Sequence, residues 1–235
     1  LIMTHGNEVP NTQGLCGGWP GATIRQRMGR NAVKDGLEQP GDWEVYGPKP
    51  GLTPMTSKDV FAVTWQGGGG YGDPLDRDLA AVEKDVAASW VSVEAARHLY
   101  GVVMKDGRAD VEASRALRAD MRASRVGKLA NDPGKRFAGK PERAIGRNLF
   151  IGRDERGFHV VTSAGHILCT NSTRWRTGAV SHTSDRLPGE HSITLHERLA
   201  VTTWYCPASG TLLAVDVHEK ESAVVDDVVL VPEAA

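Results

Sequence analysis

The sequence lacks long apolar runs, has few cysteines and carries almost no net charge. No apolar run approaches the roughly 18 to 20 residues that a membrane-spanning helix needs, so we expect a soluble protein. The three cysteines, Cys16, Cys169 and Cys206, are too few and odd in number for a disulfide framework. The chain does not open with a basic stretch followed by an apolar one, as a signal peptide would. These absences predict a protein of the reducing cytoplasm.

The charges balance over the whole chain but not along it. Lys+Arg 28 against Asp+Glu 29 gives a formal charge of −1, so no overall field attracts nucleic acid or an anionic membrane. Residues 105–147 hold twelve basic and six acidic residues, whereas residues 210–235 hold six acidic residues and one lysine. Because the Arg-rich stretch 115–128 contains Asp120 and no aromatics, it favours ion pairs with an acidic partner protein over nucleic-acid binding.

Aromatics make up only 6% of the chain, whereas it has 27 glycines and 12 prolines. Residues 6–54 are interrupted by glycine or proline every few positions and show no helical period, which predicts irregular structure. The apolar residues 1–3 predict the end of a strand. A loop stretch this long is unusual in an independent domain and predicts either the end of a larger domain or a segment that lies on a partner's surface.

Downstream, the periodicity predicts regular elements. We expect a strand at 60–65, a helix at 77–90, and a second helix at 92–100 with Ser92 as N-cap and Gly101 as C-cap. A strand at 102–104, a helix at 110–129 and a linker at 131–141 follow. Further strands are expected at 148–151, 158–161, 166–168, 193–195, 201–205, 212–217 and 224–231.

These elements predict an α+β protein in three parts. Residues 1–104 form a loop-rich N-terminal segment, residues 105–144 a basic helical linker, and residues 145–235 a small β-rich module resembling a zinc ribbon.

A glycine loop follows the first strand and consists of Gly67, Gly68, Gly69, Gly70, Tyr71, Gly72, Asp73 and Pro74. Its G-x-G-x-x-G spacing between a strand and a helix is formally that of a dinucleotide fingerprint. However, Asp73 stands where a phosphate would bind, and no second strand with an acidic end follows. We favour a close crossing of two backbone segments, with Asp73 capping the next helix and Pro74 as its first residue.

The cysteines of the β-rich module lie in degenerate zinc knuckles. Cys206-x-x-Ser209-Gly has lost its second cysteine, and the related stretch ending in Gly165-His166 has Val161 and Ala164 where cysteines would stand. A structural zinc needs four ligands, so holding one here would require His159, His166 and Cys169 as substitutes. We favour a metal-free ribbon in which Cys169 and Cys206 are ordinary buried thiols.

Other candidate ligands have structural explanations. His191 and His196 would face opposite sides of a strand, and so would Asp226 and Asp227. We expect surface histidines and, together with Asp216, a solvated acidic edge rather than a magnesium site. No nucleophile elbow or His-Glu-x-x-His helix is present. We predict no catalytic residue and no metal ligand in this chain.

The glycine loop and its surroundings carry a family resemblance. The order of the glycine run, Tyr71-Gly-Asp-Pro74 and the downstream Tyr100-Gly-Val-Val resembles the C-terminal end of B-type subunits of the hydantoinase/5-oxoprolinase family. Residues 9–21 resemble the preceding stretch of these subunits, and the likeness covers residues 1–104. Because the family's metal- and substrate-contacting residues lie in the N-terminal part of that subunit, the resemblance implies that the chemistry lies outside this chain.

Residues 145–217 are similar to the small third subunit of acetone-carboxylase-type enzymes, in which paired knuckles flank a Trp such as Trp175. The combination resembles small subunits of biotin-independent, ATP-dependent ketone carboxylases of the acetophenone carboxylase type. It implies an accessory subunit whose larger A-type and B-type partners hold ATP and magnesium. The glycine loop would then serve assembly. A subunit of a hydantoinase/5-oxoprolinase-type cyclic-amide hydrolase and a standalone zinc-ribbon binding module stay open as alternatives.

Overall fold

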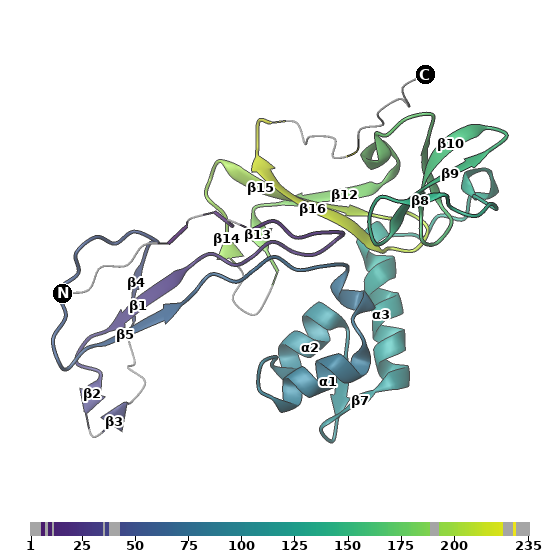
Figure 1. Cartoon of the computed structure of the whole chain (residues 1–235). Helices are drawn as coiled ribbons and strands as arrows, with labels where there is room; N and C mark the ends of the chain where they lie inside the picture. Colours follow the sequence, from purple (N-terminus) through teal and green to yellow (C-terminus); the bar gives the residue numbers. More distant parts are fainter. Residues whose placement is uncertain are drawn as a thin grey trace.

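The computed structural model describes residues 6–7, 9–10, 12–34, 36–37, 43–188, 193–222 and 228. The fold mixes strands with three α-helices, as Figure 1 shows. In Figure 1 a small N-terminal sheet lies at the left, the helices lie at the lower right, and the β-rich C-terminal part lies above the helices. None of the helices in the described parts is long and apolar enough to cross a membrane. The expected mixture of α and β structure is confirmed.

The N-terminal sheet corrects one of our predictions. Strands β1 (Arg25–Gly29), β4 (Glu44–Tyr46) and β5 (Val60–Thr64) form an antiparallel sheet in the order β4-β1-β5. A small hairpin pairs β2 (Val33–Lys34) with β3 (Gly36–Leu37). The strand expected at 60–65 is therefore confirmed, but residues 6–54 are not irregular throughout. The strand expected at residues 1–3 lies outside the described residues.

The missed strand β1 is held by contacts that its local sequence does not reveal. Gln26, in its centre, is fully buried, although a glutamine there reads as solvent-exposed. Its side-chain amide donates hydrogen bonds to the carbonyls of Gly47 and Pro48, at 3.2 and 3.1 Å. The partners lie more than 20 residues away, so the prediction was wrong because of a tertiary interaction.

The helices after the glycine loop begin where capping residues predict. The helix expected at 77–90 is present as the shorter α1 (Leu79–Ala87), and a 3₁₀ turn, η1 (Pro74–Asp76), precedes it. Asp73 caps η1 and Asp78 caps α1. Helix α2 (Val93–Tyr100) has Ser92 as its N-cap and a left-handed Gly101 as its C-cap, as expected.

Helix α3 (Val111–Val126) follows a hairpin formed by β6 (Val103–Lys105) and β7 (Arg108–Asp110). The predicted division between residues 104 and 105 therefore lies inside a hairpin. The buried side chains of Val82, Ala96 and Val102 form a small core between α1, α2 and this hairpin. A 3₁₀ turn, η2 (Pro133–Lys135), lies within the expected linker.

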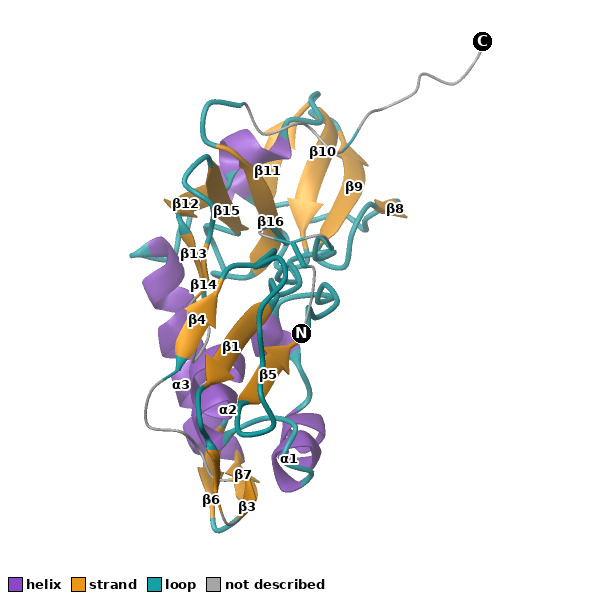
Figure 2. Ribbon diagram, turned by 90° about the vertical axis from the view of Figure 1, so that its left-hand side faces the viewer, coloured by secondary structure: helices purple, strands orange, loops and turns teal. Residues whose placement is uncertain are grey.

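The C-terminal part contains two main antiparallel sheets, seen above the helices in Figure 2. The first has the order β11-β10-β9-β8, from strands Arg143–Ala144 (β8), Leu149–Asp154 (β9), Gly157–Thr162 (β10) and Ile167–Thr170 (β11). The second has the order β12-β15-β16, from strands Val180–Ser184 (β12), Leu199–Tyr205 (β15) and Leu212–Glu219 (β16). A 3₁₀ turn, η3 (Trp175–Gly178), and a hairpin of β13 (Arg186–Leu187) with β14 (Ile193–Thr194) complete it.

The expected β-rich character of residues 145–235 is found. Strands occur at all the predicted places except 224–231, of which the structure describes only Val228. The predicted division between 144 and 145 falls between β8 and β9, which pair in one sheet.

The C-terminal sheets share their core with the N-terminal loop. One cluster joins the two main sheets through Leu149, Val160, Leu168, Trp175, Cys206 and Leu213. A second cluster contains Leu187, Leu195, Val201, Tyr205, Leu212 and Val215. Trp19 of the N-terminal loop and Val126 of α3 pack against this second cluster. All three predicted parts therefore contribute to one packed interior.

Candidate functional site

The glycine loop runs beside the N-terminal loop and is hydrogen-bonded to it. The Gly70 N–H donates to the Trp19 carbonyl at 2.8 Å, and the Gly72 N–H donates to the Leu15 carbonyl at 2.9 Å. In return, the Leu15 N–H donates to the Gly70 carbonyl at 2.9 Å. Because these amides already have carbonyl partners, they do not form the phosphate cradle of a dinucleotide fingerprint.

The two segments approach so closely that side chains would collide. A Cβ at Gly69 would lie less than 3.0 Å from the Gln13 carbonyl oxygen, and one at Gly18 equally close to the Gly70 carbonyl oxygen. Gly68 of the same loop has open space around the position of a Cβ. The close backbone crossing expected from the glycine run is therefore present, and it depends on particular glycines.

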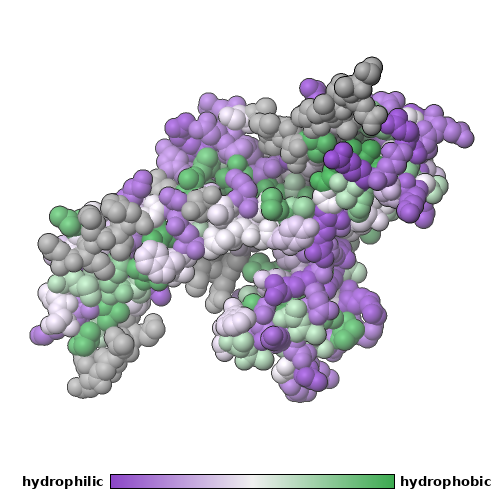
Figure 3. Space-filling view, in the orientation of Figure 1, coloured by the Kyte–Doolittle hydropathy of each residue, from purple (hydrophilic) through white to green (hydrophobic). Residues whose placement is uncertain are grey.

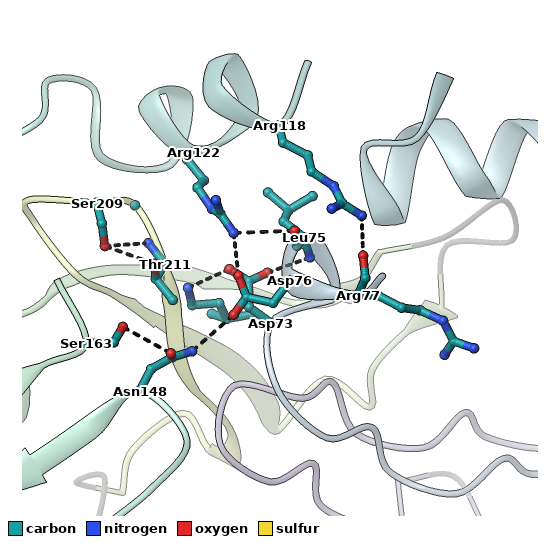
Figure 4. Close-up of polar contacts among 12 residues, drawn as sticks. Asp73, Leu75, Asp76, Arg77, Arg118, Arg122, Asn148, Ser163, Ser209 and Thr211 are labelled. Atoms are coloured by element: carbon teal, nitrogen blue, oxygen red, sulfur yellow. Dashed lines mark hydrogen bonds and ion pairs between the residues drawn. The ribbon is translucent and has the colours of Figure 1, made fainter. Parts of the chain in front are cut away.

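Asp73 ends the glycine loop and connects it to two distant segments (Figure 4). Its side chain is fully buried and accepts two hydrogen bonds from Arg125, at 2.6 and 3.0 Å. It also accepts from the backbone N–H groups of Leu75 at 3.0 Å and Leu212 at 2.9 Å. Through this one carboxylate, the glycine loop is tied to helix α3 and to the start of β16.

Asp76, one turn further on, forms a second connection of the same kind. Arg122 of α3 donates to its Oδ1, and the side-chain amide of Asn148 donates to its Oδ2 at 3.3 Å. Asn148 in turn accepts a hydrogen bond from the Ser163 hydroxyl at 3.1 Å. Figure 4 shows these groups converging on η1 from α3 and from the C-terminal part.

A pocket of about 630 Å³ lies beside the glycine loop. Two of its charged groups are held in ion pairs, since Arg77 binds Asp85 and Asp76 binds Arg122. Tyr71 is 63% exposed, and the Arg147 guanidinium lies 5.8 Å from its ring centre. The pocket is lined by Gly18, Trp19, Pro20, Gly68, Gly70, Tyr71, Gly72, Asp73, Pro74, Asp76, Arg77, Asp78, Ala81, Leu99, Tyr100, Arg147 and Pro188.

The predicted loop residues Gly67 to Pro74 and the neighbouring Leu15 form one continuous region, here called the strip. Asp73 and Pro74 are used inside the fold, as N-cap and first residue of η1. Tyr71 is exposed, and so is Leu15 (63%), its partner in an isolated β-bridge. The strip therefore combines a buried ionic anchor with an exposed apolar surface, which suits contact with another protein segment.

Sequence reasoning missed Arg125 and Leu212 as partners of Asp73. The available signal was the spacing of Arg118, Arg122 and Arg125, which places three arginines within two turns of α3. We expected these arginines to pair with a partner protein, but all three bond to groups of this chain. That expectation needs correction for Arg125, whose charge is neutralised internally by Asp73.

The two degenerate knuckles lie next to each other, but the residue that contacts Cys206 is not one of the two positions at which a cysteine was expected. The Cys206 Sγ lies 3.4 Å from the Thr162 hydroxyl, so Thr162 stands opposite this thiol rather than Val161 or Ala164. Val161 packs instead in a cluster with Phe137 and Ile167. Within the described ranges, no group of three or more His, Cys, Asp or Glu side chains is arranged to hold a metal ion.

The substitute ligands considered for zinc are engaged in other contacts. Cys206 is buried as expected, but Cys169 is only partly buried and donates to the Ser172 carbonyl at 3.0 Å. His159 is fully buried between the Asp154 carboxylate (2.7 Å) and the Thr170 hydroxyl (2.9 Å). These contacts explain the residues as parts of the hydrophobic core and of a hydrogen-bond network.

Two titratable groups near the knuckles have shifted pKa values. Burial lowers the pKa of His166, and the nearby charge of Lys135 lowers it further. Hydrogen bonds from Arg156 and then His159 hold the pKa of Asp154 far below its ordinary value. The first shift favours a neutral His166 and the second favours an ionised Asp154 near pH 7.

The remaining candidate ligands are structural or lie outside the described residues. Asp216 is not a solvated edge residue, because it accepts hydrogen bonds from Arg176 at 3.1 Å and from the Trp204 indole at 2.7 Å. His196 accepts a hydrogen bond from the Arg198 N–H at 3.3 Å. His191, Asp226 and Asp227 are not among the described residues.

An ionic cluster in the N-terminal sheet was not predicted. Arg30 bonds Glu44 at 3.1 Å and Asp59 at 3.3 Å. Backbone N–H groups of Asn31 and Thr56 donate to Asp59 and lower its pKa to about 2. The cluster fixes the loops at one end of the sheet.

Comparison of the sequence with known proteins finds similarity to two enzyme subunits. No protein-family model matches the chain. The chain is 54% identical to the caprolactamase subunit beta of Pseudomonas jessenii over 80 residues, which cover 34% of this chain and 14% of that protein. It is 29% identical to the acetone carboxylase alpha subunit of Xanthobacter autotrophicus (strain ATCC BAA-1158 / Py2) over 157 residues, which cover 54% of this chain and 20% of that protein.

The chain is therefore similar in sequence to parts of a caprolactamase beta subunit and of an acetone carboxylase alpha subunit. It spans about a seventh to a fifth of the length of these two relatives. Both relatives are named as subunits of enzymes.

Proposed function

We propose that this chain is an accessory, structural part of a multi-subunit, biotin-independent, ATP-dependent ketone carboxylase. The observation that carries the proposal is the similarity to an acetone carboxylase alpha subunit. It covers 54% of the chain, which is more than residues 1–104 alone can supply. The carboxylase likeness therefore extends beyond the glycine loop and its helices.

The geometry supports a structural role for the glycine loop. Asp73 and Asp76 hold the loop to α3 and to the C-terminal part, so the loop presents a fixed surface. Leu15, Tyr71 and Trp65 are each more than 60% exposed along or next to it. Exposed aromatic and aliphatic side chains on a rigid support are typical of protein interfaces.

In this proposal, larger A-type and B-type subunits carry ATP, magnesium and the substrate. The candidate substrate is acetophenone, which with bicarbonate and ATP gives benzoylacetate. In the carboxylation step, the enol carbon of the ketone attacks the carbon of a bicarbonate that ATP has activated by phosphorylation. The carbon–oxygen bond to the phosphate breaks, inorganic phosphate leaves and the enol proton is released. This chain contributes no reacting group and no metal ligand, zinc included, and it completes the C-terminal region of the B-type subunit.

A second candidate is a subunit of a hydantoinase/5-oxoprolinase-type cyclic-amide hydrolase. The higher identity favours it, since the chain is 54% identical over 80 residues to a subunit of caprolactamase, an enzyme named for a cyclic amide. That match covers only 34% of the chain, so it fits within the N-terminal part.

Purification of the native complex through a tag on this chain tests the proposal. The complex is assayed in parallel for fixation of radiolabelled bicarbonate with acetophenone and ATP, and for hydrolysis of caprolactam, hydantoin and 5-oxoproline. Bicarbonate fixation by a complex with larger subunits is the expected result. Lactam or hydantoin hydrolysis alone would favour the second candidate. Recovery of a stable monomer would contradict both.

If that monomer held stoichiometric zinc and bound nucleic acid in a salt-sensitive way, it would be a standalone zinc-ribbon module. The discriminating measurements are elemental analysis and a binding titration at two salt concentrations.

A further inference from the structure

A groove of about 470 Å³ lies between α3 and the segment from η1 to α1. Its apolar wall is formed by Leu75, Leu79, Val111 and Ala119. Val111 is 50% exposed, although it is a β-branched apolar residue at the start of a helix. The groove is therefore open and lined in part by apolar side chains that this chain leaves uncovered.

Three arginines of α3 line the same groove. Arg115, Arg118 and Arg122 follow at intervals of three and four residues, so they lie along one face of the helix. Figure 4 shows Arg118 and Arg122 side by side above η1, and Figure 3 shows hydrophilic side chains gathered over α3. The groove thus combines an apolar wall with a row of positive charge.

The carboxylates of this chain do not fully balance this row. Arg118 donates only to neutral groups, the carbonyls of Tyr100 at 2.9 Å and Arg77 at 2.7 Å. Burial lowers the pKa of Arg118, and the neighbouring charge of Arg122 lowers it further. Asp76 binds Arg122 but also accepts from Asn148. The positive charges of Arg118 and Arg122 therefore lie close together, and Asp76, which binds Arg122, is shared with Asn148 of the C-terminal part.

Arg122 also has a donor without an acceptor. Among the described residues, its Nε is buried from solvent and has no hydrogen-bond partner. A buried N–H group that lacks an acceptor costs free energy, so the guanidinium of Arg122 is not fully satisfied within the described residues. The Arg122 side chain is 28% exposed, and a group from outside contacts that exposed part rather than Nε. The side chain of Arg115, at the outer end of the row, is 71% exposed, and its ion-pair partner among the described residues is Glu112, whose side chain is 80% exposed.

We propose that this groove binds an acidic segment of a larger partner subunit, with carboxylates on the arginine row and apolar side chains against Leu79, Val111 and Ala119. Because guanidinium groups pair with carboxylates in bidentate geometry, the partner segment should carry glutamate or aspartate side chains. The groove is too open to enclose a small anion, whereas a protein segment covers the exposed valine as well. The inference rests on the proposed function, because it requires a partner subunit.

Cross-linking of the native complex tests the contact directly. Arg115→Lys places an amine on the groove, and a carbodiimide joins an amine to a carboxylate only where the two touch. The expected product is a cross-link between the introduced lysine and an Asp or Glu of a larger subunit, identified by mass spectrometry. Arg97→Lys, on the exposed surface of α2, is the matched control and should give no such product. A cross-link only to Glu112 of the same chain overturns the inference.

Two further variants measure what the contact contributes. Arg115→Glu reverses a charge on the row, and Ala119→Trp fills the groove without a change of charge. Both should weaken binding to the larger subunits about tenfold or more, while Arg97→Glu should not. Thermal unfolding of each purified chain checks that the fold is intact. Unchanged binding by both variants in a complex that still forms would overturn this inference alone, whereas no complex with the unmodified chain would overturn the proposed function.

Discussion

Arg125 donates two hydrogen bonds to Asp73, from Nη1 to Oδ2 at 2.6 Å and from Nη2 to Oδ1 at 3.0 Å. The side chain of Asp73 is fully buried, and that of Arg125 is 15% exposed. Removal of one partner leaves a buried charge unpaired, so we expect this pair to stabilise the contact of the glycine loop with α3 and β16.

Asp73→Asn should therefore lower the free energy of unfolding by about 3–5 kcal/mol, since Arg125 loses its counter-ion. Urea unfolding followed by circular dichroism measures the change. Glu112→Gln, in the exposed pair with Arg115, is the control and should cost about 0.5 kcal/mol or less. Equal effects of the two variants would show that Asp73 is not an anchor.

Gly69→Ala should destabilise the protein by about 1–3 kcal/mol, because the new methyl group collides with the Gln13 carbonyl. Gly68→Ala, one residue earlier, meets open space and should be neutral or slightly stabilising. The same urea experiment compares the two. A crossing that tolerates both alanines would not be tight.

Tyr71→Ala should leave the unfolding free energy within about 0.5 kcal/mol, because the side chain is mostly exposed. It should lower the amount of complex recovered by about fivefold or more if the glycine loop contacts a larger subunit. Trp90→Ala removes an aromatic side chain that is 78% exposed and does not line the pocket, and it serves as the control. Normal assembly with abolished turnover would assign Tyr71 to catalysis instead.

Acid should destabilise the N-terminal sheet through Asp59. Its folded-state pKa of about 2 lies below the ordinary value of about 3.9, so the folded state favours the ionised form. The resulting stabilisation is present above about pH 4 and is lost as the pH falls toward 2. Asp59→Asn should flatten this part of the pH dependence, measured as unfolding midpoints between about pH 2 and 5.

Chelation should leave the unfolding temperature unchanged, since hydroxyl and thiol groups face each other where zinc ligands would stand. Elemental analysis of the purified chain should find zinc well below one atom per molecule. A large fall in unfolding temperature with chelator would instead indicate a structural metal.

Local signals predicted the elements whose boundaries depend on neighbouring residues. Ser92, Gly101 and Asp73 act as caps within a few residues of their own positions, and they were found where capping preferences place them. Strand β1 was missed because Gln26 is stabilised by carbonyls from a different loop. The site was predictable to the same extent: the glycine run indicated a close crossing, but its partner segment was not evident.

The charges show a similar limit. The basic stretch 105–147 correctly indicated that arginines gather on one helix, but not which of them are neutralised within the chain. Asp73 and Asp76 reach α3 from another part of the sequence, and the Leu212 N–H reaches Asp73 from a third part. Pairing across such separations depends on the three-dimensional arrangement and leaves no mark in local composition.

The Asp73 carboxylate also has a consequence for the order of events during synthesis. Its partner Arg125 is made 52 residues later, but its partner Leu212 only 139 residues later. At about 5–20 residues per second, a ribosome needs roughly 7 to 30 s to deliver Leu212 after Asp73. Until then Asp73 lacks one of its hydrogen-bond donors, and the glycine loop of the nascent chain is accessible to chaperones and proteases.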